Sequence, residues 1–216
     1  MAGGKKRQTS NWIDGVFLSR TDTSDGSLGV EAQLFDQKSS WFASYVRSYV
    51  SSETIDSENF VVDRGSLHHN RELPYGLSLH GNLSWQSTRR EILPSSEQFF
   101  IGGEGSVRGY PVGIYGGDSG QAINLELHHP LLTASEATNG VGATGFFFAD
   151  YGRVKPFRAP NSHLDEYDEL TGVGWGVHSA LGKNVYARVT FAYGLTRTPL
   201  QPRNYEITFQ LIATAF

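Results

Sequence analysis

Residues 95–120 read SSEQFFIGGEGSVRGYPVGIYGGDSG and combine many glycines with a single arginine, Arg108. Three kinds of chemistry use such a stretch. A glycine-rich turn can bind phosphate through its backbone amides, a serine in a tight turn can act as a nucleophile, and a glycine-rich loop can fold back closely onto its own protein.

Phosphate binding is the weakest of the three. Gly103-Glu104-Gly105 begins a dinucleotide-type pattern, but that pattern requires a further glycine at position 108, where the chain has arginine. No Gly-Lys-Ser/Thr follows, and the stretch leads into a predicted strand rather than into the start of a helix. The sequence therefore predicts no nucleotide or other cofactor here.

The nucleophile alternative depends on 117–120, Gly-Asp-Ser-Gly, which resembles the motif of trypsin-like serine proteases with Ser119 as nucleophile. That chemistry needs a histidine base backed by a carboxylate. Gln121 stands where those proteases have a second glycine, and no Ala-His-Cys occurs in the chain. We keep the protease as a remote alternative and expect that the protein is not an enzyme.

Composition excludes several further classes. The 216 residues carry a formal net charge of −4 with scattered basic residues, which argues against a nucleic-acid partner. There is no cysteine, and the adjacent pairs His68-His69 and His128-His129 would point to opposite faces of a strand, so no metal site is expected. Residues 1–10 (MAGGKKRQTS) are polar and basic with no apolar segment after them, which predicts a disordered start rather than a signal peptide.

Alternation of apolar and polar residues dominates the rest of the chain. Ile123, Leu125 and Leu127 alternate with polar residues, and glycines 172, 174 and 176 alternate with apolar ones. Such a period of two indicates strands. Clear runs lie at 28–34, 77–86, 123–128, 172–178, 185–193 and 205–213, and weaker runs lie near 12–20, 40–50, 58–69 and 143–154.

These runs predict an all-β fold with about ten strands of roughly 9–13 residues, a length that suits tilted strands crossing a membrane. No apolar stretch is long enough for a spanning helix, and the mean hydropathy is −0.34. Short connections near residue 182 alternate with long ones at 86–120 and 155–169. We therefore expect an antiparallel transmembrane β-barrel domain over residues 11–216, with a soluble β-sandwich as the alternative.

An ordered set of motifs resembles the two-partner secretion transporters, of the haemolysin-activator or filamentous-haemagglutinin transporter type. The resemblance covers roughly residues 74–216. Its motifs are 95–103 (SSEQFFIGG), 106–110 (SVRGY), 117–120 (GDSG), 124–127 (NLEL) with Pro130, and 145–152 (GFFFADYG). It implies that the chain matches the C-terminal part of a barrel of about sixteen strands. Members of this transporter family also carry a signal peptide and periplasmic domains.

The resemblance also implies an inward-folding loop, 86–120, whose Arg108 pairs with Asp150. The loop-motif residues implied with them are Gly102, Gly103, Val107, Gly109, Tyr110 and Asp118. The alternation agrees, because Asp150 shares a strand face with Phe146 and Phe148 and an ionised residue facing lipid would cost roughly 2–4 kcal/mol. On the neighbouring strand, Asn124 and Glu126 are expected to face the lumen, and glycines 172, 174 and 176 to form a smooth wall for the loop.

The implied function is a translocator in the outer membrane of a Gram-negative bacterium. It would secrete an unfolded exoprotein partner of haemolysin or adhesin type, without making or breaking a bond. Outer-membrane lipid and the barrel-assembly machinery are the further partners that the resemblance implies. The alternative within the same superfamily is the barrel of an outer-membrane protein assembly factor.

Overall fold

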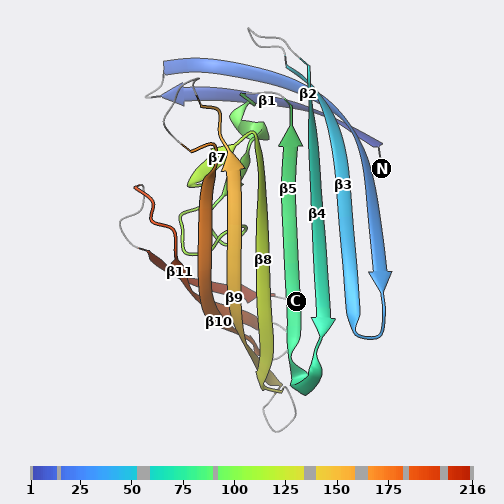
Figure 1. The fold of residues 1–216 in the computed structure, drawn as a ribbon, viewed down its shortest axis with the longest axis vertical. Helices are drawn as coiled ribbons and strands as arrows, with labels where there is room; N and C mark the ends of the chain where they lie inside the picture. The colour runs from blue at the N-terminus through green and yellow to red at the C-terminus, as the bar shows by residue number, and fades with distance from the viewer. Residues whose placement is uncertain are drawn as a thin grey trace.

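The computed structural model describes residues 2–13, 16–52, 59–89, 92–133, 140–158, 165–181, 185–199 and 204–214, with the backbone alone for residues 2–25. Within these ranges the chain forms one large antiparallel sheet, a two-stranded hairpin and two short 3-10 turns (Figure 1). Neither turn has the length or the apolarity to cross a membrane.

The large sheet contains ten strands in the order of the sequence. Because each strand pairs with the next one along the chain, the sheet is an up-and-down meander. The strands are β1 (Ala2–Ile13), β2 (Val16–Phe35), β3 (Ser39–Ser52), β4 (Phe60–Glu72), β5 (Ser78–Thr88), β8 (Ser119–Leu132), β9 (Val141–Lys155), β10 (Asp168–Leu181), β11 (Val185–Gly194) and β12 (Tyr205–Ala213). The prediction of an all-β antiparallel fold with about ten strands is confirmed.

Three details of the predicted strands are wrong. Residues 1–10 were expected to be disordered, yet Ala2–Ile13 forms strand β1 and pairs in register with β2, because backbone hydrogen bonds in a ladder do not require apolar side chains. The run at 12–20 is divided between β1 and β2. Several strands also exceed the expected length, and β2 has 20 residues.

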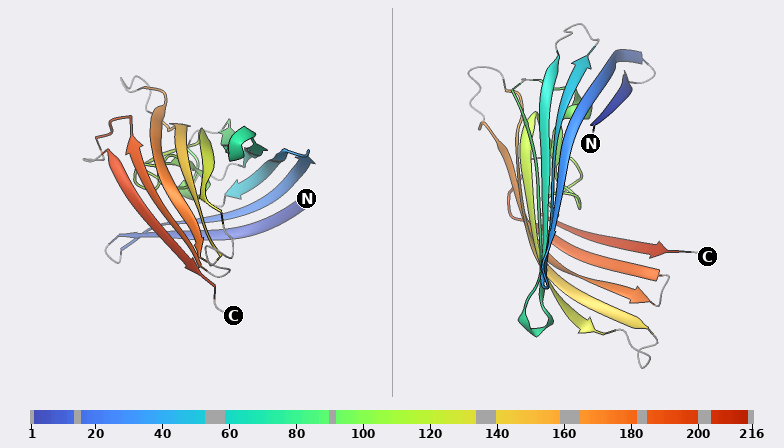
Figure 2. Two further views of the ribbon diagram at one scale, coloured as in Figure 1. Left: turned by 90° about the horizontal axis from the view of Figure 1, so that it is seen from below. Right: turned by 90° about the vertical axis from the view of Figure 1, so that its right-hand side faces the viewer.

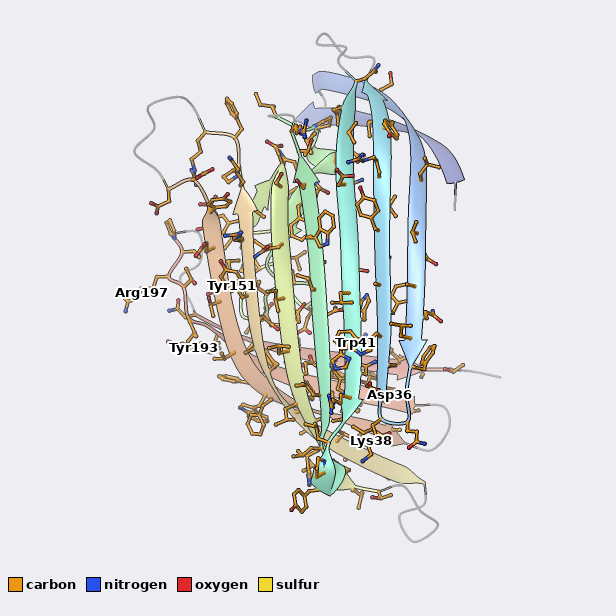
Figure 3. The ribbon with its side chains drawn as sticks, turned by 45° about the vertical axis from the view of Figure 1, so that its right-hand side comes forward. Asp36, Lys38, Trp41, Tyr151, Tyr193 and Arg197 are labelled. Carbon is orange, nitrogen blue, oxygen red and sulfur yellow. The ribbon has the colours of Figure 1, made fainter. Side chains whose placement is uncertain are left out.

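The two ends of the sheet differ in the length of their connections. Short turns join β2 to β3 and β4 to β5 at one end, and Figure 3 shows Asp36 and Lys38 in the first of them. At the other end, 89–118 joins β5 to β8 and 156–167 joins β9 to β10. Short periplasmic turns and long outer loops are typical of outer-membrane barrels, so this asymmetry orients the sheet.

The sheet has an apolar outer face and a more polar inner face. Large apolar side chains are exposed on the outer face, and the directly opposite residues Leu127, Phe147, Trp175, Phe191 and Ile207 form one row across five strands. Phe147 and Ile207 are 70% and 65% exposed. Inner-face neighbours such as Glu126 and Asp150 are covered. A band of this kind on the outside is the pattern of a sheet that faces lipid.

The inner face carries the long connection between β5 and β8. This segment, 89–118, is called the inner loop below. It contains the 3-10 turn η2 (Ser95–Glu97) and the hairpin of β6 (Phe99–Ile101) with β7 (Tyr115–Gly117), and Figure 2 shows it within the curve of the sheet. Its bounds are narrower than the predicted 86–120, because residues 86–88 belong to β5 and Ser119 begins β8.

Candidate functional site: the arginine of the inner loop

Arg108 lies at the tip of the inner loop, pressed against β9. Its side chain is 4% exposed and that of Asp150 is 0% exposed. The guanidinium donates from Nε to Asp150 Oδ2 over 2.7 Å and from Nη2 to Oδ1 over 2.8 Å, and the backbone N of Arg108 donates to Oδ2 over 3.1 Å. Two parallel bonds from a planar fork fix orientation as well as distance. The pair Arg108–Asp150 is called the latch.

The neighbouring strand β8 contributes a second carboxylate and an amide. Arg108 Nη1 donates to Glu126 Oε1, and Asn124 Nδ2 donates to Asp150 Oδ1 over 2.9 Å and to the carbonyl oxygen of Ser106. The guanidinium carbon also lies 3.6 Å from the centre of the Phe148 ring. Asn124 and Glu126 were expected only to line the lumen, whereas in the structure both hold the latch.

Glycines on the inner face make room for the loop tip. A Cβ atom on Gly152 would lie 2.7 Å from Val107 Cγ2, and a Cβ atom on Gly172 would overlap the carbonyl oxygen of Arg108. Of the three β10 glycines that were expected to form a smooth wall for the loop, only one contacts the loop. Gly172 accommodates the loop, while Gly174 and Gly176 are covered by the rings of Phe148 and Phe146.

Tyr110 extends the contact of the loop to the far strands. Its side chain is buried, and its hydroxyl donates to the carbonyl oxygen of Thr171 over 2.8 Å and accepts from the backbone N of Thr196 over 2.8 Å. The preceding Gly109 has φ of 90°, and a Cβ atom there would lie 2.8 Å from the backbone N of Gly194. Only glycine combines that backbone conformation with so close an approach.

The remaining glycines of the motif shape the turn before the tip. Gly102 and Gly103 have φ of 110° and 85°. The backbone N of Gly102 donates to Ser106 Oγ over 2.8 Å, which closes residues 102–106 into a compact turn. Val107 then packs into a cluster with Ile101, Tyr110, Val154 and Leu170. The loop tip thus has an apolar core of its own between the sheet and the hairpin.

A second polar cluster holds the base of the inner loop, and its role was not found from the sequence. Arg64 on β4 donates to Glu97 Oε2 over 2.8 Å and to Gln86 Oε1 over 2.8 Å. Gln86 donates to the carbonyl oxygens of Glu97 and Asp118, and the Asp118 carboxylate accepts from the backbone N of Ile92 and Leu93. We call Arg64, Gln86, Glu97 and Asp118 the base clamp. The sequence pattern that could have indicated this cluster is the placement of Arg64 and Gln86 on the inner face of their strands.

The geometry gives no support to the protease alternative. Ser119 begins a strand, and its Oγ accepts from the backbone N of Thr88 over 3.1 Å. The Asp118 carboxylate caps backbone amides instead of orienting a histidine. Within the described ranges, no group of three or more histidine, aspartate or glutamate side chains is arranged to hold a metal ion.

The comparisons with known proteins agree with this geometry. The family model described as haemolysin secretion/activation protein ShlB/FhaC/HecB matches residues 1–179. A comparison with curated proteins finds no relative. Among solved structures, CdiB from Escherichia coli is similar with a TM-score of 0.82 at 18% identity, over 100% of this chain and 41% of that one. CdiB from Acinetobacter baumannii gives 0.76 at 18% identity, over 98% and 38%.

The chain therefore spans about two fifths of the length of these solved structures, which share its fold. The matched family is the secretion branch rather than the assembly-factor branch that the sequence left open. Its members are transporters and not enzymes. On the match over most of its length, the chain belongs to the haemolysin secretion/activation family, the two-partner secretion transporters of the Gram-negative outer membrane.

Proposed function

We propose that this chain lines part of a pore through which an unfolded exoprotein of haemolysin or adhesin type crosses the outer membrane, and that the inner loop gates that pore. The observation that carries the proposal is the buried latch. Arg108 holds the loop tip against β9 and β8 on the face opposite the exposed apolar band. A loop fixed there occupies the space that a translocating polypeptide needs.

Gating of this kind requires no chemical step. The closed arrangement is stabilised by the latch, by the hydroxyl of Tyr110 and by the base clamp. An exoprotein segment opens the path by displacing the loop tip, so its binding must outweigh the loss of these contacts. Arg64 and Gln86 of the base clamp hold the base of the loop to β4 and β5, whereas Arg108 holds the tip to β9 and β8, so the tip can move while the base stays attached.

The experiment is to replace Arg108 with alanine in the protein in its native outer membrane and to measure the amount of exoprotein secreted. Without the latch the closed arrangement loses its main contact, so we expect the amount of exoprotein secreted to change while the barrel still accumulates. Arg47→Ala is the matched control, because Arg47 forms the same forked pair with Asp63 on the outer face. Unchanged secretion by Arg108→Ala at normal barrel abundance would contradict the proposed gate.

We also propose that the outer face contacts outer-membrane lipid and that the barrel-assembly machinery inserts the protein. The exposed row that includes Phe147, Trp175 and Ile207 supports the first part. Depletion of the assembly machinery should lower the amount of folded protein in the outer membrane, measured by its heat-dependent mobility on a gel. An undiminished amount of folded protein would contradict the second part.

A further inference from the structure

Glu126 is shared by three cationic or ionisable side chains, and only one of them belongs to the inner loop. Its Oε1 accepts from Arg108 and, over 3.2 Å, from Nη2 of Arg188 on β11. Its Oε2 lies 2.7 Å from Nε2 of His128 on its own strand. If the loop tip leaves, Arg108 leaves with it, whereas Arg188 and His128 stay with the sheet.

The two arginines occupy equivalent places on the inner face. The Arg108 guanidinium lies over the Phe148 ring and the Arg188 guanidinium lies over the Phe146 ring, 3.6 Å and 4.4 Å from the ring centres. The two rings are 6.3 Å apart, and each lies across a glycine of β10, which fixes its position. Arg188 Nε also donates to Thr190 Oγ1 over 3.3 Å. Arg188 is thus held by the wall, beside the place that Arg108 would vacate.

We infer that Arg188 is a positioning residue for opening, because it takes over the Glu126 carboxylate when Arg108 withdraws. A partly buried carboxylate that loses its only guanidinium would strongly oppose opening. With Arg188 already at 3.2 Å, Glu126 keeps a charged donor in both states. Asp150 keeps the Asn124 amide. The inference rests on the proposed gate, since it concerns a loop tip that leaves the wall.

This role of Arg188 predicts whether its removal makes opening of the loop rarer or more frequent. In the closed state Glu126 has both guanidinium groups, but in the open state it has only that of Arg188. Removal of Arg188 therefore costs the open state more than the closed state and makes opening rarer. If Arg188 were merely a brace for the closed loop, its removal would make opening more frequent. The two roles predict opposite changes.

The opening can be followed with one thiol, because the chain has no cysteine. Val107 belongs to the loop tip and is fully buried where the tip packs against the sheet. A Val107→Cys side chain therefore reacts with a maleimide only while the tip is away from the wall. When reclosing is fast, the labelling rate reports the open fraction. The rate is measured in the native outer membrane without the exoprotein, in the Val107→Cys background with and without Arg188→Leu.

We expect Arg188→Leu to slow labelling by about tenfold, the size expected for one charge-assisted hydrogen bond. Arg188→Lys, which keeps the charge without the fork, should fall between Arg188→Leu and the parent, and it replaces Arg188→Leu if that variant does not fold. Arg153→Leu is the matched control. Arg153 lies over the Tyr167 ring on the outer face of the sheet, so its removal should leave the labelling rate unchanged.

Faster labelling in either Arg188 variant, or an unchanged rate in both, overturns the inference. The proposed gate is judged separately, by secretion and by Arg108→Leu. If Arg108→Leu accelerates labelling but Arg188→Leu does not slow it, the gate stands and the role of Arg188 fails. If labelling is unchanged even by Arg108→Leu, the gate itself fails.

Discussion

The latch can be tested by removing its two partners separately and together. Arg108→Leu leaves the Asp150 carboxylate with the Asn124 amide and one backbone N–H, and Asp150→Leu leaves the guanidinium with Glu126. Each single change breaks a pair whose side chains are 4% and 0% exposed. Arg108→Leu with Asp150→Leu replaces the pair by two apolar side chains of moderate size and leaves neither partner of the latch buried alone.

The structure sets the expected magnitude. Loss of one partner of a buried ion pair costs about 3–5 kcal/mol, and the residual partners at this site favour the lower end, about 3 kcal/mol for each single variant. The double variant should also lose about 3 kcal/mol instead of about 6 kcal/mol, because the second substitution removes the unpaired charge that the first one created. The coupling energy is therefore about 3 kcal/mol.

The assay is the free energy of unfolding of the barrel in lipid vesicles, from denaturant titrations followed by tryptophan fluorescence. Arg47 and Asp63 provide a matched cycle. They form the same fork at 2.7 and 2.9 Å, but their side chains are 47% and 23% exposed, so solvent screening should make their coupling much weaker than that of the latch. Additive losses at Arg108 and Asp150, or equal coupling in the two cycles, would refute the reasoning that burial gives the latch its strength.

Three other variants test neighbouring features. Glu97→Gln weakens the base clamp by about 1 kcal/mol, since Arg64 is partly exposed, and should make the inner loop severalfold more sensitive to protease. Gly172→Ala places a methyl group against the Arg108 carbonyl and should raise the conductance of the pore in planar bilayers, whereas Gly26→Ala, which meets nothing, should not. Hydrogen bonds from the Ser39 hydroxyl and from the backbone N of Lys38 and Ser39 lower the pKa of Asp36. Because that pKa is lower in the fold than in the unfolded chain, the turn is stabilised at neutral pH and loses this contribution as the pH falls through the lowered value. The protection factor of the Lys38 amide, which is corrected for the intrinsic pH dependence of exchange, should then fall in acid, but not in Asp36→Asn.

The fold was predictable because side-chain alternation along a strand is a local property. The faces assigned to Leu125, Phe147 and Asp150 from their parity are the faces that they occupy. The latch was predicted from a motif resemblance, and parity alone would have indicated only that Asp150 faces inward. The start of the chain was less predictable, because the polar residues 1–10 carry no apolar pattern that distinguishes an extended strand from disorder.

The contacts that sequence reasoning missed join residues far apart in the chain. Arg64 and Glu97 are 33 residues apart, and Arg188 and Glu126 are 62 residues apart. Parity indicates the face of each strand residue but not which side chain of a folded-back loop will reach it. The path of the inner loop decides those pairs, and it depends on close approaches at Gly152 and Gly172 that only the assembled sheet defines.

The inner face of β10 has a consequence for how freely this strand can change. At three alternate positions it offers no side chain at all, since Gly172, Gly174 and Gly176 are filled by a carbonyl oxygen and two phenylalanine rings from elsewhere. The intervening Val173, Trp175 and Val177 face outward and need only be apolar. In a saturation mutagenesis library, tolerance along β10 should therefore alternate from residue to residue. The outward-facing positions should accept many apolar replacements, and the three glycine positions should accept none.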